Sequence, residues 1–316
     1  MKNVLCVGSI TADIITSPVD SLPEKGTLRA VENITISVGG CASNAAIDLA
    51  KLGIPVAIAS KLGDDPMGRY VKDELEKHGV NIRGLVTGSV PTTVSNVCLT
   101  SDGERSFLYS PGSAADFSIA DVDRNLLEMT DIVFVAGAML LKRFDGRECA
   151  DLLRTARAAG KTTVMDTAWD YEGIWLDKIS EALPYLDIFM PSIAEAKKLA
   201  GVDDDDGYRE IAARLKALGP KNIVVKLGNK GAYMLTENGE EMLAPTYTSI
   251  KPVDTTGAGD AFCAGFIAGL SLGKAYDECL RLGNAVGTSC VRKIGASAGI
   301  LSMQETVRFM NENIPG

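Results

Sequence analysis

Apolar and polar positions repeat along this chain with two periods, and the period changes several times. Between residues 118 and 231, short apolar runs alternate with longer stretches whose apolar residues recur every three or four positions. The first pattern is typical of buried strands and the second of amphipathic helices. The predicted strands span 131–136, 162–166, 186–190 and 222–227, and the predicted helices span 118–129, 145–159, 192–200 and 205–218. This order, with a first strand at 3–10, predicts an α/β fold whose central, mostly parallel sheet has helices on both faces.

Two segments interrupt this alternation and predict a second, smaller sheet. Residues 27–38 alternate between apolar and polar positions, as in a half-buried strand of an antiparallel sheet. Residues 93–110 predict a partner hairpin with Asp102 and Gly103 in its turn. We therefore expect a single domain over residues 1–316, with a small sheet formed by segments of about 11–38 and 92–112.

Composition narrows the class of protein. The net charge of −9 and the lack of a basic patch disfavour nucleic-acid partners, and no apolar run approaches the roughly 20 residues that span a membrane. The N-terminus lacks the layout of a signal peptide. Seven scattered cysteines, an odd number without a Cys-x-x-Cys pair, are typical of free thiols in a reducing compartment. We expect a cytoplasmic protein without nucleic-acid or membrane partners.

The single histidine limits the chemistry. His78 stands at the end of a helical pattern, where a cation suits the helix C-terminus. One histidine in this place argues against histidine-based triads and excludes two-histidine zinc motifs. Carboxylates, backbone dipoles and bound cations must therefore carry any reaction.

Residues 253–262, Val-Asp-Thr-Thr-Gly-Ala-Gly-Asp-Ala-Phe, are the most informative stretch. The small residues Gly257, Ala258 and Gly259 leave backbone N–H groups open at the start of an apolar helix, which is a site for an anion such as phosphate. Asp260 would lie beside that anion, where a carboxylate is repelled unless it accepts a proton from an attacking hydroxyl. From these residues alone, a plain strand–turn–helix joint remains the alternative.

Other polar or glycine-rich positions stand where α/β sheets bind ligands. Asp13 follows the first strand, although a turn residue would also fit. Gly39 and Gly40 precede a helix that carries Asn44, and they suit either a close ligand or tight packing.

Ser192 and Glu195 have the spacing of a capping box at a helix start. A capping role leaves room for a second role of the Glu195 carboxylate.

These motifs resemble the signatures of the ribokinase-like (pfkB) carbohydrate kinases. Residues 254–260 are similar to Asp-Thr-x-Gly-Ala-Gly-Asp, and residues 39–46 to Gly-Gly-x-x-x-Asn-x-Ala. The resemblance implies a three-layer ribokinase-like fold whose small sheet forms a lid over the substrate and a homodimer contact. It implies that Asp260 is the general base and that the three residues before it form an anion hole for the transferred phosphoryl group.

The resemblance also implies positions for the ligands. The sugar would contact Asp13, Gly39, Gly40 and Asn44. ATP would contact Ser192, Lys226, Gly228, Gly231 and Asn284, where Ser192 replaces the Asn of the family pattern. Glu195 would organise water bound to Mg²⁺. A monovalent-cation loop, with K⁺ as its ion, would comprise Asp254, Thr256, Cys290, Lys293, Gly295 and Gly299.

The sequence thus predicts an ATP-dependent kinase that phosphorylates a hydroxyl of a small carbohydrate of the ribose, ketohexose or keto-deoxy sugar type. The alternatives are a nucleoside kinase, a phosphosugar kinase and a non-catalytic sugar-binding protein. A nucleoside needs aromatic surfaces, and aromatic residues are only 6% of the chain. A phosphosugar needs a cationic clamp, for which Arg29 and Arg105 are the candidates. A sugar-binding protein would have no use for Asp260 beside a phosphate. Residues 166–170 receive no role.

Overall fold

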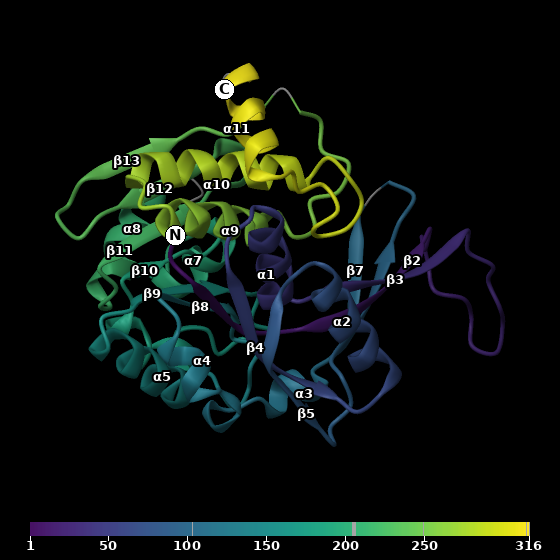
Figure 1. Ribbon diagram of the computed structural model, residues 1–316. Helices are drawn as coiled ribbons and strands as arrows, with labels where there is room; N and C mark the ends of the chain where they lie inside the picture. The colour runs from purple at the N-terminus through teal and green to yellow at the C-terminus, as the bar shows by residue number, and fades with distance from the viewer. Residues whose placement is uncertain (103, 204–206, 249, 314, 316) are drawn as a thin grey trace.

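The computed structural model describes residues 1–316 except 103, 204–206, 249, 314 and 316. Gly103 of the predicted hairpin turn lies outside the described residues. So do residues 204–206, which include the predicted start of a helix at 205. The described chain forms a large and a small sheet with helices packed around the large one (Figure 1).

The large sheet has the strand order β13-β12-β11-β10-β9-β8-β1-β4-β5. Its strands are β1 (Val4–Gly8), β4 (Val56–Gly63), β5 (Asn81–Gly88), β8 (Ile132–Ala138), β9 (Thr162–Thr167), β10 (Ile188–Phe189), β11 (Asn222–Lys226), β12 (Ala232–Leu235) and β13 (Glu241–Ala244). Neighbours from β5 to β11 are parallel, and β12 and β13 add antiparallel pairs at one edge. The strand order reverses at β1, between β4 and β8. Open α/β sheets bind ligands beyond the strand ends at such a point.

Helices cover both faces of the large sheet. The helices are α1 (Cys41–Lys51), α2 (Pro66–Lys77), α3 (Gly112–Asp116), α4 (Arg124–Glu128), α5 (Arg147–Ala158), α6 (Leu176–Ile179), α7 (Ile193–Ala200), α8 (Tyr208–Ala217), α9 (Ala258–Ser271), α10 (Tyr276–Cys290) and α11 (Met303–Glu312), with 3-10 turns η1 (Ile119–Asp121), η2 (Leu183–Tyr185) and η3 (Gly228–Lys230). In β1, Val4 and Cys6 pack with α1, α9 and α10, whereas Leu5 and Val7 pack with α5, α7 and α8. Alternate side chains of one strand thus enter two apolar layers, which confirms the predicted fold class.

The small sheet has the order β3-β2-β6-β7. Its strands are β2 (Thr11–Ser17), β3 (Asn33–Gly39), β6 (Val94–Leu99) and β7 (Arg105–Ser110). The predicted strand and the 93–110 hairpin both lie in this sheet, but the prediction that they pair directly was wrong. The strand begins at Asn33 and pairs with β2, and the hairpin joins β2 through a parallel pair with β6. Polar residues on both faces of β2 hid this strand from the alternation pattern.

The predicted helix 118–129 is divided into η1 and α4. Asp123 accepts a hydrogen bond from the Asn125 N–H and caps α4, so a second helix starts inside the predicted one. Among the described residues, no helix combines the length and apolar character needed to cross a membrane.

Candidate active site

The start of α9 has the geometry of an anion site. Gly257 is its N-cap with φ 76°, in the left-handed region, and a Cβ at this position would lie 2.6 Å from the Ala296 carbonyl oxygen. Only glycine fits here without strain or a clash. The residues that follow form the first helical turn, whose first N–H groups have no partner within the helix, and this turn lines a cavity of about 820 Å³.

This cavity collects the predicted nucleotide residues from distant parts of the chain. Its walls include Ser192, Lys226, Gly228, Gly231 and Asn284, together with Glu195 and Gly257 to Asp260. Its volume is within the range of small-molecule sites.

Asp260 lies in the first turn of α9 and accepts a hydrogen bond from Asn44 of α1 (Nδ2–Oδ2 2.8 Å). Burial raises the pKa of Asp260, and the nearby Glu195 charge adds to this rise. Asn44, Lys226 and Cys41 oppose it without cancelling it. The Oδ1 atom of Asn44 is buried and has no hydrogen-bond partner among the described residues. Asn44 can therefore position the Asp260 carboxylate and still accept a hydrogen bond from a ligand.

Asp13 lies on β2, on the face of the small sheet that it shares with its cross-strand neighbours Ser37 and Ser95. Burial raises the pKa of Asp13 to about 7, and the negative charge of Asp260 adds to the effect. The two carboxylates thus belong to one electrostatic site.

The two predicted sugar-site glycines make room for neighbouring groups. A Cβ on Gly39 would overlap the Asp13 carboxylate, and one on Gly40, where φ is 92°, would lie 2.6 Å from the Ser9 carbonyl oxygen. Their absent side chains therefore shape the site around Asp13.

Lys226, at the end of β11, forms a buried ion pair with Asp166, at the end of β9 (Nζ–Oδ2 2.6 Å). Burial alone would lower the pKa of Lys226, but the nearby Asp166 and Glu195 charges outweigh it and raise this pKa. The ammonium therefore stays charged. A Cβ on Gly259 would lie 3.4 Å from Nζ, so this charge lies beside the start of α9.

Glu195 and Ser192 form the predicted capping box of α7. The Ser192 N–H donates to Glu195 Oε2 (2.9 Å), and the Glu195 N–H donates to Ser192 Oγ (3.4 Å). The Thr167 hydroxyl also donates to Oε2 (3.0 Å), and among the described residues these bonds engage only that oxygen. The described residues contain no cluster of three or more His, Cys, Asp or Glu side chains that could hold a metal alone. One carboxylate beside the anion site fits Mg²⁺, which is commonly held by a few carboxylates, phosphates and water.

The remaining predicted nucleotide residues shape the cavity wall. Gly228 begins η3 and Gly231 follows it, with φ of 61° and 93°. The Asn284 amide donates to the carbonyl oxygens of Ala244 and Pro245 (2.8 and 3.1 Å), so it ties α10 to the chain after β13.

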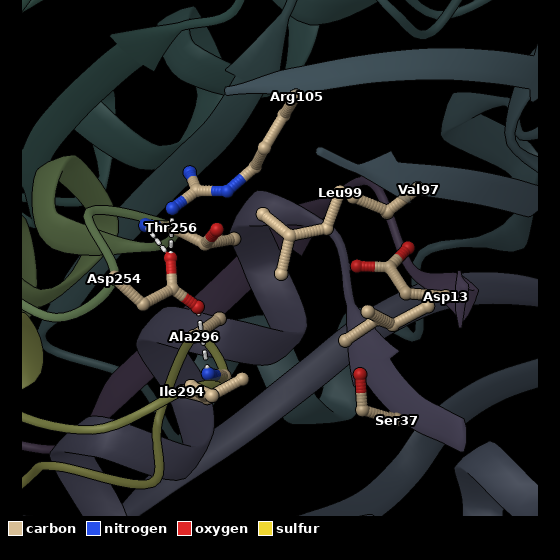
Figure 2. Close-up of a pocket in the computed structure, with 11 residues that line it drawn as sticks. Asp13, Ser37, Val97, Leu99, Arg105, Asp254, Thr256, Ile294 and Ala296 are labelled. Atoms are coloured by element: carbon tan, nitrogen blue, oxygen red, sulfur yellow. Dashed lines mark hydrogen bonds and ion pairs between the residues drawn. The ribbon is translucent and has the colours of Figure 1, made fainter. Parts of the chain in front are cut away.

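Asp254 has partners other than a cation. Its carboxylate forms an ion pair with Arg105 of β7 and accepts hydrogen bonds from the N–H groups of Thr256 and Gly295 (both 2.8 Å) (Figure 2). Thr256 is another predicted cation ligand. Its carbonyl oxygen accepts a hydrogen bond from the Cys290 thiol (3.3 Å). The residues present therefore do not fit a potassium ion at Asp254.

The other members of the predicted cation loop are placed as follows. Lys293 is exposed, and its N–H lies 3.5 Å from the Cys290 carbonyl oxygen. A Cβ on Gly299 would lie 2.5 Å from that same oxygen, so Gly299 allows a close backbone contact.

The two candidate arginines have separate roles. Arg29 donates to the backbone oxygen and hydroxyl of Ser21 within the same segment (2.9 and 2.7 Å). Arg105 and Asp254 line a cavity of about 20 Å³ whose wall also includes Asp13 (Figure 2). Neither arginine is available as a free phosphate clamp in this arrangement.

Sequence reasoning missed some polar groups of the site. Asp166 had a signal, since it ends a parallel strand at the ligand edge, but its pairing with Lys226 joins residues 60 positions apart. Tyr109 of β7 has a buried hydroxyl without a hydrogen-bond partner among the described residues. A lone tyrosine on a strand carries no such signal.

Comparisons with known proteins bear on the family and the fold of this chain. The family model described as "pfkB family carbohydrate kinase" matches residues 1–303. A ribokinase of Arabidopsis thaliana is 28% identical over 324 residues, covering 98% of this chain and 82% of that protein. A 2-dehydro-3-deoxygluconokinase of Bacillus subtilis is 27% identical over 298 residues, or 91% of each chain. The structure of Arabidopsis thaliana ribokinase complexed with ribose and ATP has a TM-score of 0.85 at 25% identity and covers 98% of both chains.

Proposed function

Because the chain belongs to the pfkB family of carbohydrate kinases and is an ATP-dependent sugar kinase, we propose that it phosphorylates a hydroxyl of a small unphosphorylated sugar with Asp260 as general base. The observation that carries this proposal is the position of Asp260 in the first turn of α9, which is the anion site. Asn44 holds the carboxylate there through a hydrogen bond. A sugar hydroxyl placed against Asp260 would lose its proton to the carboxylate as its oxygen bonds to the γ-phosphorus of ATP, while the bond from that phosphorus to the bridging oxygen breaks and ADP leaves.

The arrangement supports charge stabilisation on the transferred group. The first turn of α9 lines the cavity, where its N–H groups would meet the phosphates, and Lys226 adds a positive charge beside this turn. Donors of this type commonly lower a barrier by about 3 kcal/mol each. The ATP phosphates would lie in the cavity that Lys226 and the first turn of α9 both line.

Glu195 is the proposed magnesium residue and acts through bound water. Glu195 would hold magnesium through water, and the ion would supply positive charge beside the ATP phosphates. The hydrogen bonds from Ser192 and Thr167 hold the Glu195 carboxylate at the cavity wall. Potassium forms no part of the proposed reaction, because Arg105 forms an ion pair with Asp254, the carboxylate that was predicted to bind potassium.

Asp13 supports a neutral sugar as the acceptor. A carboxylate can accept hydrogen bonds from two sugar hydroxyls, whereas it would repel a substrate phosphate nearby. Arg105 is paired with Asp254 and Arg29 with Ser21, so the cationic clamp of a phosphosugar site is not supported. Ribose, ketohexoses and keto-deoxy sugars are the candidate acceptors.

The small sheet is the proposed lid and dimer surface. Ile36 and Leu108 lie on the face opposite Asp13, with Ile34 two residues further along the same face. They are 39%, 62% and 64% exposed, and this apolar face would be covered by a second copy of the chain. All seven cysteines lie among the described residues as free thiols, which supports the proposed cytoplasmic location.

A coupled assay of ADP release tests the proposal. The panel should contain ribose, ketohexoses, 2-keto-3-deoxy sugars, phosphosugars and nucleosides. We expect activity on an unphosphorylated sugar and a fall in kcat of about 10²- to 10⁴-fold for Asp260→Asn. Asp64→Asn, the same change at a side chain that is 84% exposed, is the matched control. An Asp260→Asn enzyme within about threefold of wild type would contradict the general-base role.

A further inference from the structure

An ion pair joins the small sheet to the loop before the anion site. Arg105 starts β7, and Asp254 lies three positions before Gly257, the N-cap of α9. The two side chains are only 19% and 10% exposed, so the pair is largely removed from water. Figure 2 shows the guanidinium reaching from the small sheet to Asp254 across the edge of the small cavity.

Asp254 holds three segments together. Its Oδ1 accepts from Arg105 and from the Thr256 N–H, and its Oδ2 accepts from the Gly295 N–H. The Gly295 segment continues to Ala296, whose carbonyl oxygen faces the space left by the missing side chain of Gly257. The position of Asp254 therefore fixes the backbone from which the first turn of α9 starts.

A shielded carboxylate requires a positive partner, because burial of an unpaired charge is strongly unfavourable. Burial alone would raise the pKa of Asp254, but the hydrogen bonds from Gly295 and Thr256 and the charge of Arg105 outweigh it and lower this pKa. The carboxylate is thus ionised. A second cation at Oδ1 would lie next to the guanidinium and would be repelled by it.

We propose that Arg105 takes the place of a monovalent cation at Asp254, so that the small sheet, through Arg105, fixes the loop before the anion site instead of bound potassium. Arg105 is then a positioning residue, since it acts through Asp254. This inference rests on the proposed function at one point, because it assumes that the start of α9 is the phosphate site. It predicts a kinase that does not require potassium.

The test compares rates in potassium chloride and tetramethylammonium chloride at matched ionic strength. We expect equal rates for wild type in both salts. Arg105→Gln should lose activity about ten- to a hundredfold in tetramethylammonium, the loss typical of a hydrogen bond to a charged group, and regain much of it in potassium. Arg105→Lys should keep most activity without potassium. Arg29→Gln is the control, because it removes the same charge from an exposed side chain in the segment between β2 and β3. This variant should behave as wild type in both salts.

Thermal melting of the unliganded proteins supplies a readout independent of catalysis. Potassium should leave the melting temperature of wild type unchanged and raise that of Arg105→Gln. A potassium requirement in wild type, or an Arg105→Gln enzyme unchanged in both salts, would overturn the inference. The inference would also be overturned if Arg105→Gln melted like wild type but were inactive in both salts. The role of Arg105 would then not be to supply a positive charge that potassium can replace. If no sugar is phosphorylated at all, the proposed function fails, while the melting comparison still decides the role of Arg105.

Discussion

At the scale of single residues, the side chains around Asp260 set its charge. Burial and Glu195 favour the protonated form, whereas Asn44, Lys226 and Cys41 favour the carboxylate. A general base works only when deprotonated, so the pKa of Asp260 sets the acid side of the pH profile. Because this pKa is raised, activity should begin to fall at a higher pH than it would for an ordinary aspartate.

Removal of the Asn44 donor should move that acid limb further. In Asn44→Leu, Asp260 loses the hydrogen bond that stabilises its charged form, so the fall in kcat/KM should begin at a higher pH. We expect the loss relative to wild type to be about tenfold greater at pH 6 than at pH 9. The measurement is a full pH profile of kcat/KM with the best sugar. Asn125→Leu, at an exposed position of α4, is the control. A profile that is only lowered, without a shift, would assign Asn44 to sugar binding alone.

Asp13 should make the stability of the free enzyme depend on pH. Its pKa is about 7 in the fold against an ordinary value of 3.8, so folding favours the protonated form. The stability this gives is present at low pH and is lost as the pH rises to about 7. Asp13→Asn avoids that loss and should melt higher than wild type, with a larger gain at pH 8 than at pH 5. In a large domain each kcal/mol corresponds to about 2–4 °C. An equal gain at both values would contradict the raised pKa.

At the scale of elements, the start of α9 depends on one glycine. Gly257→Ala would force a side chain into the left-handed region and against Ala296, and so displace the first-turn N–H groups. We expect kcat to fall about 10²- to 10³-fold, as for loss of an anion-hole donor, while KM for the sugar changes little. Gly273→Ala is the matched control, because Gly273 follows the same helix with φ 71° and has no atom within 4 Å of the added Cβ. If kcat fell by a similar factor in both variants, backbone strain alone would explain the loss, and the anion-site role of the first turn would be contradicted.

The sequence allowed good prediction of elements whose pattern is local. The strands and helices between 131 and 231 follow from apolar periodicity, since each buries its own side chains in a layer of the core. Pairing between strands does not follow in the same way. The polar strand β2 escaped detection, and the partner of β3 was wrongly assigned because strand pairing depends on residues distant in the sequence.

The same distinction applies to the site. The glycine turn at 257–259 and the capping box at Glu195 have local signatures, so their residues could be named in advance. The pairs Asp166–Lys226 and Arg105–Asp254 join positions 60 and 149 residues apart. An isolated aspartate or arginine does not specify its partner, so these contacts required the three-dimensional structure.

At the scale of the whole molecule, the apolar outer face of the small sheet should control assembly. Changing Ile34 and Leu108 together to Glu places charges on that face, and we expect the proposed dimer to become a monomer in sedimentation experiments. Met129→Glu places a charge on an apolar side chain that is 66% exposed at the end of α4, outside the small sheet, and it should leave the dimer intact. Wild type that already sediments as a monomer at micromolar concentration would contradict the assignment of this face.

The contact between Asn44 and Asp260 also has a consequence for synthesis on the ribosome. These residues are 216 positions apart, and α9, which follows the last strand of the large sheet, packs on the same apolar layer as α1. A nascent chain that ends before residue 258 can contain every strand of that sheet but leaves apolar surface of β1 and α1 uncovered. At about 5–20 residues added per second, that surface stays exposed for several seconds before α9 and α10 are complete. The unfinished chain should therefore bind chaperones, and it cannot be a kinase until synthesis has entered its last fifth, which begins with α9.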